Sequence, residues 1–307
     1  MATGSRLDSK KILDLKEEYE YMNEKEIMAK ALVAVDESDH SERAVILAAR
    51  FAKETGVSLT LLHVIDDIKS YKELPDDLAY KPKIDKAKEL LHRFKRLAEA
   101  NRATDVQTMI AVGPVTEEII RIGEENDFDY LVVGTRGFGT FKRFFLGSVA
   151  DKVVRNAHLP VVVIRPIEKE KRIPFEKGDK KMRLLVGVDD SKASEKAVLG
   201  TSQFAGKADV HITLLHVLED VVHYDEIPNT YVYNLRKAEA EKILNKAKAI
   251  AEAIGIKDID TKIVAGPVVE EINRELKDHA SVVLGWKDGS VFGKLISTAP
   301  RPIVIIR

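Results

Sequence analysis

The sequence has 307 residues, 45% of them hydrophobic, and this length favours two domains of ordinary size. Its 49 basic and 50 acidic residues leave the net charge near zero, so no overall charge attracts a polyanion such as nucleic acid. The chain has no cysteine, which excludes disulfides, thiolate metal sites and a thiol nucleophile. No apolar run suits a signal peptide or approaches the roughly 20 residues that span a bilayer. We therefore expect a cytoplasmic protein that binds neither nucleic acid nor membrane.

Strands and helices alternate along the first half of the chain. Before them, apolar residues recur among charges from Arg6 to Met22, which indicates an amphipathic helix. The first predicted helix begins near Asp39, with Glu42 as its capping partner, and ends at Gly56. The other predicted helices are Lys83–Asn101, Val115 to about Asn126, and Ser148–Ala157. The predicted strands are Ala31–Val35, Leu59–Val64, Val106–Val112, Tyr130–Val133 and Val161–Ile164. This order predicts an α/β fold, a doubly wound five-stranded parallel sheet with helices on both faces.

The chain contains this domain twice. Ala31–Asp67 aligns without a gap with Leu184–Asp220, at an offset of 153 residues, and 18 of the 37 aligned pairs are identical. A segment rich in charge, with proline and glycine, separates the two copies. We therefore predict an N-terminal helical extension at 1–28, a first domain at 29–165, a linker at 166–181 and a second domain at 182–307.

A glycine-rich loop follows the fourth predicted strand. Gly134 and Gly137 precede nine further residues and then Gly147-Ser148, where the next helix begins. Ligands of parallel sheets bind beyond the carboxyl ends of the strands, and this loop lies at such an end. Glycines let backbone amides approach phosphate oxygens, and a helix start supplies free amides. Asp36 ends the first strand at the same edge, where it either binds a ribose or a metal or caps the following helix.

These residues resemble the universal stress protein family over both copies. Its ATP-binding members carry a Gly-x2-Gly-x9-Gly-Ser/Thr pattern, which Gly134, Gly137, Gly147 and Ser148 match position by position. The Leu-Leu-His-Val segment that ends at Val64 and the closing Pro-Val-Val-Val-Ile-Arg segment also look like the family. The resemblance implies two tandem domains of the adenine nucleotide alpha hydrolase-like fold, with ATP, ADP or AMP bound in the first, either with or without Mg²⁺.

The resemblance also implies roles for individual residues. The glycines and Ser148 would hold the phosphates, and Asp36 would hold the ribose or a nucleotide-bound magnesium ion. Val35 and Val64 would contact the adenine. Arg136, between the first two glycines, would add positive charge or remain a solubilising group. The full set of candidate binding residues is Val35, Asp36, Val64, Val133, Gly134, Arg136, Gly137, Gly147, Ser148 and Val149.

The second copy departs from the pattern. From Gly285 to Pro302 there are nine fewer residues than from Gly134 to Pro160, which we interpret as a loss from both the loop and the helix, with no second Gly-Ser pair. Trp286, the only tryptophan, is predicted to pack where a ligand would lie. We therefore expect the second site to be empty or to bind nucleotide much more weakly.

No nucleophile, base and orienting group come together in the sequence, so we predict no catalytic residue. The leading hypothesis is a regulatory module in which bound ATP or AMP stabilises a conformation that a partner recognises. Two alternatives remain open: a slow ATPase or phosphotransfer enzyme with Asp36 holding magnesium, and a structural dimerisation module without nucleotide. We also expect the two copies to form an internal pseudo-dimer, and chains to form a homodimer. His63 and His216, at equivalent positions, are each expected to make one structural hydrogen bond.

Overall fold

The computed structural model describes residues 29–66, 76–135, 147–165, 181–205, 210–219, 229–287 and 289–307. The predicted N-terminal helix and most of the predicted linker lie outside these residues. The chain divides into two compact units, one built on Met28–Lys171 and the other on Arg172–Arg301. Apart from Pro302–Ile305, which belongs to the unit built on Met28–Lys171, the units correspond to the two copies of the sequence repeat, and each copy is described by itself.

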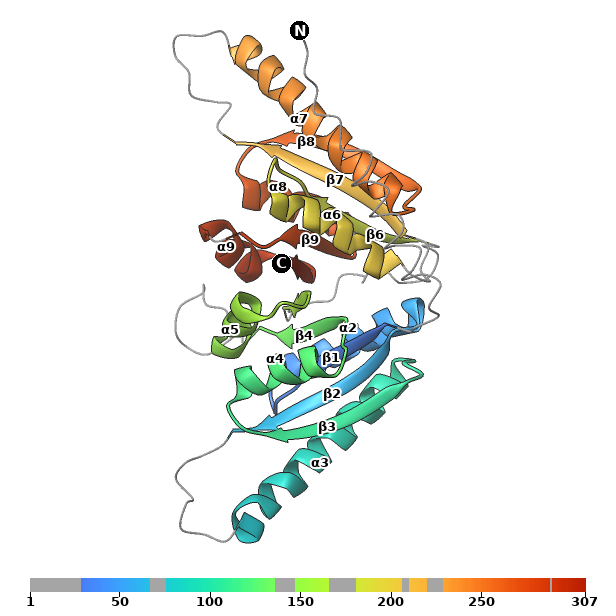
Figure 1. The fold of residues 1–307 in the computed structure, drawn as a ribbon, viewed down its shortest axis with the longest axis vertical. Helices are drawn as coiled ribbons and strands as arrows, with labels where there is room; N and C mark the ends of the chain where they lie inside the picture. The colour runs from blue at the N-terminus through green and yellow to red at the C-terminus, as the bar shows by residue number, and fades with distance from the viewer. Residues whose placement is uncertain are drawn as a thin grey trace. The chain divides into compact units, whose positions relative to one another are not determined.

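The first unit alternates strands and helices (Figure 1). In chain order its elements are β1 (Lys30–Ala34), α2 (Asp39–Thr55), β2 (Ser58–Ile65), α3 (Asp76–Ala100), β3 (Val106–Val112), α4 (Val115–Glu125), β4 (Tyr130–Gly134), α5 (Ser148–Asn156) and β5 (Val161–Ile164). The inner strands β1 and β4 are short apolar runs because both faces of the sheet are covered there, and Leu32 and Leu131 on them are completely buried, as is Leu61 on β2.

The strands of the first unit form one parallel sheet in the order β3-β2-β1-β4-β5. Figure 1 shows β3, β2, β1 and β4 as successive arrows of the blue-to-green part. Helices α2 and α3 contact each other, as do α4 and α5. Because the chain first winds outward from β1 and then returns to its other side, right-handed crossovers place the two helix pairs on opposite faces. The predicted doubly wound fold is confirmed.

The second copy repeats this plan. Its elements are β6 (Met182–Gly187), α6 (Lys192–Ala205), β7 (Val210–Leu218), α7 (Asn229–Ala253), β8 (Asp258–Ala265), α8 (Val268–Glu275), η2 (Leu276–Asp278), β9 (Ser281–Gly285), α9 (Ser290–Thr298) and β10 (Ile303–Ile306). Strands β9, β6, β7 and β8 are parallel neighbours in this order, and β10 lies next to β9. The register of β6 on β7 places Leu184 opposite Ile212, as Ala31 lies opposite Leu59 in the first unit.

The strands predicted in the first copy lie within one residue of the observed ones, whereas two helix starts differ. Helix α3 begins at Asp76, seven residues before the prediction. Helix α2 is capped by Ser38 rather than Asp39, because the Ser38 side chain accepts a hydrogen bond from the Ser41 amide. Gly56 ends α2 as predicted, in the left-handed conformation. Among the helices of the described residues, none could cross a bilayer.

Candidate functional site

The candidate site of the first unit lies where β1 and β4 end. These strands are neighbours, with Val33 opposite Val132, and the connections that follow them lead to opposite sides of the sheet. Such a topological switch point opens a crevice at the carboxyl ends of the strands. Asp36 follows β1 by two residues and Gly134 is the last residue of β4, so the fold brings both predicted residues to this crevice.

Asp36 organises the turn between β1 and α2. Its Oδ1 accepts hydrogen bonds from the Ser38 amide (3.0 Å), the Ser38 hydroxyl and the Ser41 hydroxyl (2.7 Å). In return, the Asp36 amide donates to the Ser41 hydroxyl (2.8 Å). The network holds Ser38 in place as the N-cap of α2, so Asp36 supports the helix start without being the cap itself. The carboxylate is therefore fixed at the mouth of the crevice.

The described side chains could supply only part of the ligands of a magnesium ion. Among the described residues there is no group of three or more histidine, aspartate or glutamate side chains arranged to hold a metal. Magnesium commonly takes one or two carboxylates and completes its shell with water and phosphate oxygens. Asp36 supplies one carboxylate of the kind that such a site uses, and its Oδ1 accepts three hydrogen bonds from the serines.

Gly134 has a packing role that its sequence context did not reveal. A Cβ built on Gly134 would lie 3.3 Å from the carbonyl oxygen of His40, in the first turn of α2. The glycine therefore allows the end of β4 to approach the start of α2 closely. The next residue, Thr135, donates its amide to the Ile164 carbonyl (2.9 Å), which ties the start of the loop to β5.

The far end of the glycine loop is the start of α5. Gly147 is the N-cap of α5, and Ser148 is its exposed first residue. The first amides of a helix have no partner within it, so those of Ser148 and Val149 are donors for a ligand. The predicted residues Arg136 and Gly137 lie outside the described residues.

Three of the four predicted valines are buried and belong to the sheet edge. Val133 lies within β4 and Val64 within β2, near their carboxyl ends. Val35 directly follows β1, where its amide donates to the Leu62 carbonyl (2.9 Å) and its own carbonyl accepts from His63 Nδ1 (2.9 Å). Both backbone groups of Val35 thus have partners, so its contribution to a ligand would be mainly its side chain. His63 makes the structural hydrogen bond that we predicted.

The second unit repeats the aspartate turn. Asp189 Oδ1 accepts from the amide and the hydroxyl of Ser191, and the Asp189 amide donates to the Ser194 hydroxyl (3.0 Å). His216 Nδ1 lies 2.7 Å from the Val188 carbonyl oxygen, as His63 does with Val35. A difference appears at Asp189 Oδ2, which lies 3.6 Å from Lys287 Nζ. The second unit has therefore kept the scaffold of the site but has added a lysine to it.

The predicted loss of helix from the second copy is wrong. Helix α9 has nine residues, as α5 has, and it begins after Gly289 as α5 begins after Gly147. The sequence from Gly289-Ser290 to the end of the chain therefore aligns without a gap with the sequence from Gly147-Ser148, so a second Gly-Ser pair is present. All nine missing residues belong to the loop, where three residues lie between Gly285 and Gly289.

Trp286 packs beside the second site. Its amide donates to the Ile306 carbonyl (2.7 Å), its ring centroid lies 5.1 Å from that of Phe292, and the Arg307 guanidinium lies 5.4 Å from its ring centroid. A pocket of about 410 Å³ lies at the carboxyl ends of β6, β7 and β9, and Trp286 is outside the set of described residues that line it. The prediction that Trp286 fills the position of a ligand is therefore wrong.

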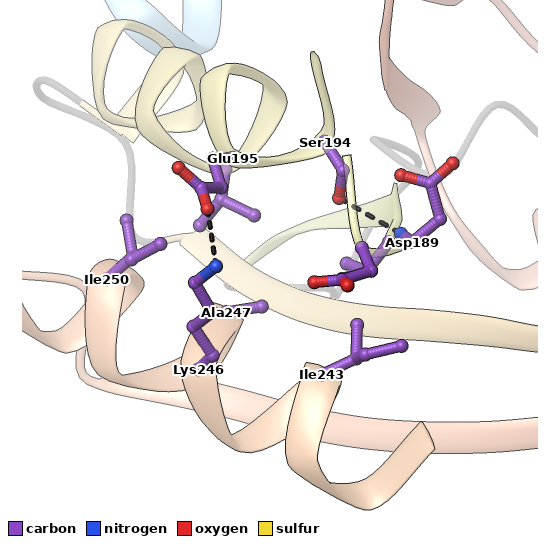
Figure 2. A pocket seen from close by; sticks show the side chains of 10 residues that line it. Asp189, Ser194, Glu195, Ile243, Lys246, Ala247 and Ile250 are labelled. Carbon is purple, nitrogen blue, oxygen red and sulfur yellow. Dashed lines mark hydrogen bonds and ion pairs between the residues drawn. The ribbon is translucent and has the colours of Figure 1, made fainter. Parts of the chain in front are cut away.

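A second, smaller cavity lies on the opposite side of Asp189. Figure 2 shows it between α6 and α7, where Lys246 forms an ion pair with Glu195 (2.6 Å) and Ile243 and Ile250 also line the cavity. Its volume of about 10 Å³ has room for no more than one water molecule. The ion pair raises the pKa of Lys246. We therefore regard this cavity as a packing feature of the helix pair and not as a ligand site.

Sequence reasoning missed the serines that hold the aspartates. Ser38 and Ser41 recur as Ser191 and Ser194 at the same offset of 153 residues, in the pattern Asp-x-Ser-x-x-Ser. The repeat could have revealed these serines, because a polar pattern that both copies of a diverged domain retain indicates a hydrogen-bond network common to both. The contact of Lys287 with Asp189 was missed because it joins two loops that lie far apart in the sequence.

Comparisons with known proteins agree with the fold. The model of the Universal stress protein family matches residues 28–165 and 181–307. A universal stress protein of Methanocaldococcus jannaschii is 30% identical over 152 residues, which are 48% of this chain and 88% of that protein. The crystal structure of a universal stress protein from Archaeoglobus fulgidus has a TM-score of 0.62 at 22% identity and covers 91% of this chain and 96% of its own. A functionally unknown protein from Pseudomonas aeruginosa PAO1 has a TM-score of 0.56 at 15% identity, with 91% and 92% covered.

Proposed function

The chain belongs to the universal stress protein family, and from that premise we propose that its first copy binds an adenine nucleotide, ATP or its relatives ADP and AMP, as a regulatory ligand. The observation that carries the proposal is the position of the glycines: Gly134 is the last residue of β4, and Gly147-Ser148 is the start of α5. These are the two ends of the glycine pattern, and they bound one loop at the switch point of the sheet.

The described residues offer a distinct group for each part of a nucleotide. The phosphates would accept hydrogen bonds from the amides of Ser148 and Val149 and from the Ser148 hydroxyl, with the positive end of the α5 dipole behind them. Asp36 would accept from the ribose hydroxyls or bind a magnesium ion on the phosphates. The adenine would pack on the apolar edge that Val35 and Val64 provide. In this proposal Arg136 and Gly137 belong to the phosphate loop.

The proposed role of the nucleotide is to stabilise one conformation of the first copy. A ligand at the switch point contacts the ends of β1 and β4 and the start of α5, so it links elements from both sides of the sheet. Binding to the folded state alone stabilises it by about 2.7 kcal/mol when the ligand is present at 100 times its Kd. A partner that recognises the stabilised conformation would then respond to the nucleotide. The cytoplasmic location, the internal pseudo-dimer and a homodimer stay predictions.

Two substitutions at Ser148 test which group holds the phosphates. Ser148→Ala removes only the hydroxyl, whereas Ser148→Pro also removes the amide donor. Proline is favoured at the first position of a helix, and the extended backbone of Gly147 (φ −56°, ψ 147°) suits a residue that precedes proline. Each lost charge-assisted bond is worth about 1.5–3 kcal/mol, so we expect Ser148→Ala to weaken ATP binding about tenfold and Ser148→Pro considerably more.

The measurement is calorimetric titration of ligand-free protein with ATP, with circular dichroism as the check that each variant is folded. The matched control is Ser290→Pro, at the equivalent position of α9, which should leave ATP affinity in the first copy unchanged. A folded Ser148→Pro variant that binds ATP as tightly as the native protein would show that α5 does not hold the phosphates.

A further inference from the structure

The second unit contains a well-formed pocket where the first unit has its candidate site. The pocket has a volume of about 410 Å³, within the range of roughly 300–1,000 Å³ that is usual for small-molecule sites. It opens at the carboxyl ends of β6, β7 and β9 and is bounded by α8 and α9. The described residues that line it belong to the second unit, so this copy supplies the groups from which the site is argued. We call it the second-copy pocket.

Most of the wall of the second-copy pocket is apolar. Val188 and Leu215 contribute from the strand ends, Ile272 from α8, Leu284 from β9 and Phe292 from α9, and each is at most 9% exposed. Such a wall suits a flat or ring-shaped apolar body, which gains by leaving water. The hydrogen bonds of His216 and Ser194 to the backbone keep the edge of this wall in shape.

The charged groups of the pocket point to a single anionic group on the ligand. Lys287 lines the pocket and is exposed enough to reach a ligand, with 67% of its side chain accessible. The acidic residues Asp189 and Glu219 also line it, and Asp189 lies 3.6 Å from Lys287. One phosphate or carboxylate beside Lys287 is therefore compensated, whereas further negative charges would approach two carboxylates.

The shortened loop leads to the same conclusion. In the first copy, twelve residues lie between Gly134 and Gly147, and in the second only three lie between Gly285 and Gly289. Both Gly285 and Gly289 line the pocket, at the end of β9 and before the start of α9. The few amides of so short a loop can surround one anionic group but cannot follow a chain of three phosphates.

We infer that the second-copy pocket binds a small ligand with one apolar ring system and one anionic group, held by Lys287, and discriminates against polyphosphates. This specificity differs from that of the first copy, whose longer loop is proposed to bind ATP as well as ADP and AMP. The anionic group could be the phosphate of a nucleoside monophosphate or the carboxylate of an aromatic acid, and the test distinguishes these sources.

Trp286 provides a reporter that lies beside this pocket. It is the only tryptophan in the chain, and its ring packs on Phe292, which lines the pocket. Binding in the second-copy pocket should therefore change the fluorescence of Trp286, whereas the first copy has no tryptophan to report. The test titrates the full chain with AMP, adenosine, ATP and indole-free aromatic carboxylates such as benzoate. Equilibrium dialysis of the same ligands, on the Ser148→Pro variant, measures binding without relying on a spectral change.

AMP or the carboxylate should bind at least about tenfold more tightly than ATP. Lys287→Gln should weaken that ligand about tenfold or more and leave neutral adenosine unaffected, because only the anionic group uses the lysine. Saturation by AMP identifies a nucleoside monophosphate, and saturation by benzoate alone identifies an aromatic acid. Val291→Phe, which fills part of the cavity, should abolish binding of either.

Three results would overturn the inference: no binding of AMP or benzoate by both methods, equal affinity for ATP and AMP, or a folded Lys287→Gln variant with native affinity. Failure of the first-copy proposal would appear separately, as ATP binding that Ser148→Pro does not weaken. Different variants therefore test the two proposals: Ser148→Pro for the first copy and Lys287→Gln for the second.

Discussion

The closest packing at the site involves a glycine at the end of β9. A Cβ on Gly285 would lie 1.9 Å from the carbonyl oxygen and 2.1 Å from the carbonyl carbon of Ala193, whereas a Cβ on Gly134 would lie 3.3 Å from its nearest neighbour, the carbonyl oxygen of His40. Backbone atoms cannot rotate away as a side chain can. The same glycine is therefore a packing requirement in both copies, and a much stricter one in the second.

We predict that Gly285→Ala destabilises the protein by more than about 3 kcal/mol and Gly134→Ala by about 1 kcal/mol. Gly293→Ala is the matched control, since Gly293 is exposed on α9 and a Cβ there meets nothing within 4 Å. Alanine at that position should stabilise the helix by up to about 1 kcal/mol. Urea unfolding followed by circular dichroism measures all three. Equal losses for Gly285→Ala and Gly134→Ala would refute the packing argument.

A buried histidine makes the stability of the second unit depend on pH. His279 is 2% exposed, and its Nδ1 donates to the Glu275 carbonyl (2.7 Å) while its Nε2 lies 3.0 Å from the Thr213 hydroxyl. Burial lowers the pKa of His279, so the ring stays neutral in the folded state. In the first copy the equivalent position, just before β4, is Phe128, which shows that an aromatic ring fits there without a charge.

In the unfolded chain this histidine takes up a proton near pH 6.5, but in the folded protein it does so only at a lower pH. Between these two values the unfolded state binds more protons, so stability falls as the pH is lowered, by up to about 1.4 kcal/mol per pH unit. His279→Phe should remove this part of the dependence, whereas His92→Gln, at an exposed position of α3, should not. Urea midpoints at pH 7.5 and 5.5 measure the slope, and an unchanged slope in His279→Phe would contradict the assignment.

Regular elements were predictable because their signals are local and repeated. The apolar run of β5 and the glycine that ends α2 define those elements without knowledge of the rest of the fold. The N-cap of α2 was misplaced by one residue because Ser38 and Asp39 are both good caps, and the choice depends on the bonds that Asp36 makes with Ser38. A network between side chains is a tertiary feature, so residue preferences alone cannot rank the two.

Loop length was the least predictable feature of the site. In the second copy, the deletion is confined to the loop. The length of sequence after Gly285 cannot show this, because it does not reveal where α9 begins. The nine residues of α9 and the four of β10 must cover and complete their sheet, so they cannot be shortened without exposing the core. Loops carry no such constraint. Divergence between duplicated domains is therefore expected in the loops, which are also the segments that bind ligands.

At the scale of the whole molecule, duplication has produced two related scaffolds with different binding loops. Both units keep the aspartate turn, the histidine that bonds to the first strand end and the glycine that ends the fourth strand. They differ in the segment between that glycine and the next helix. One chain thus combines a site proposed for a nucleotide with several phosphates and a site proposed for a ligand with one anionic group.

This division predicts the stoichiometry of the purified protein. Denaturation of the full chain should release at most one nucleoside triphosphate per chain, quantified by chromatography against the protein concentration, because only the first copy has a loop long enough to surround several phosphates. Ser148→Pro should lower that amount toward zero, whereas Lys287→Gln should leave it unchanged and reduce only a ligand with a single anionic group. Two triphosphates per chain would mean that the three residues between Gly285 and Gly289 suffice to bind a polyphosphate, and that loop length does not determine specificity in this duplicated fold.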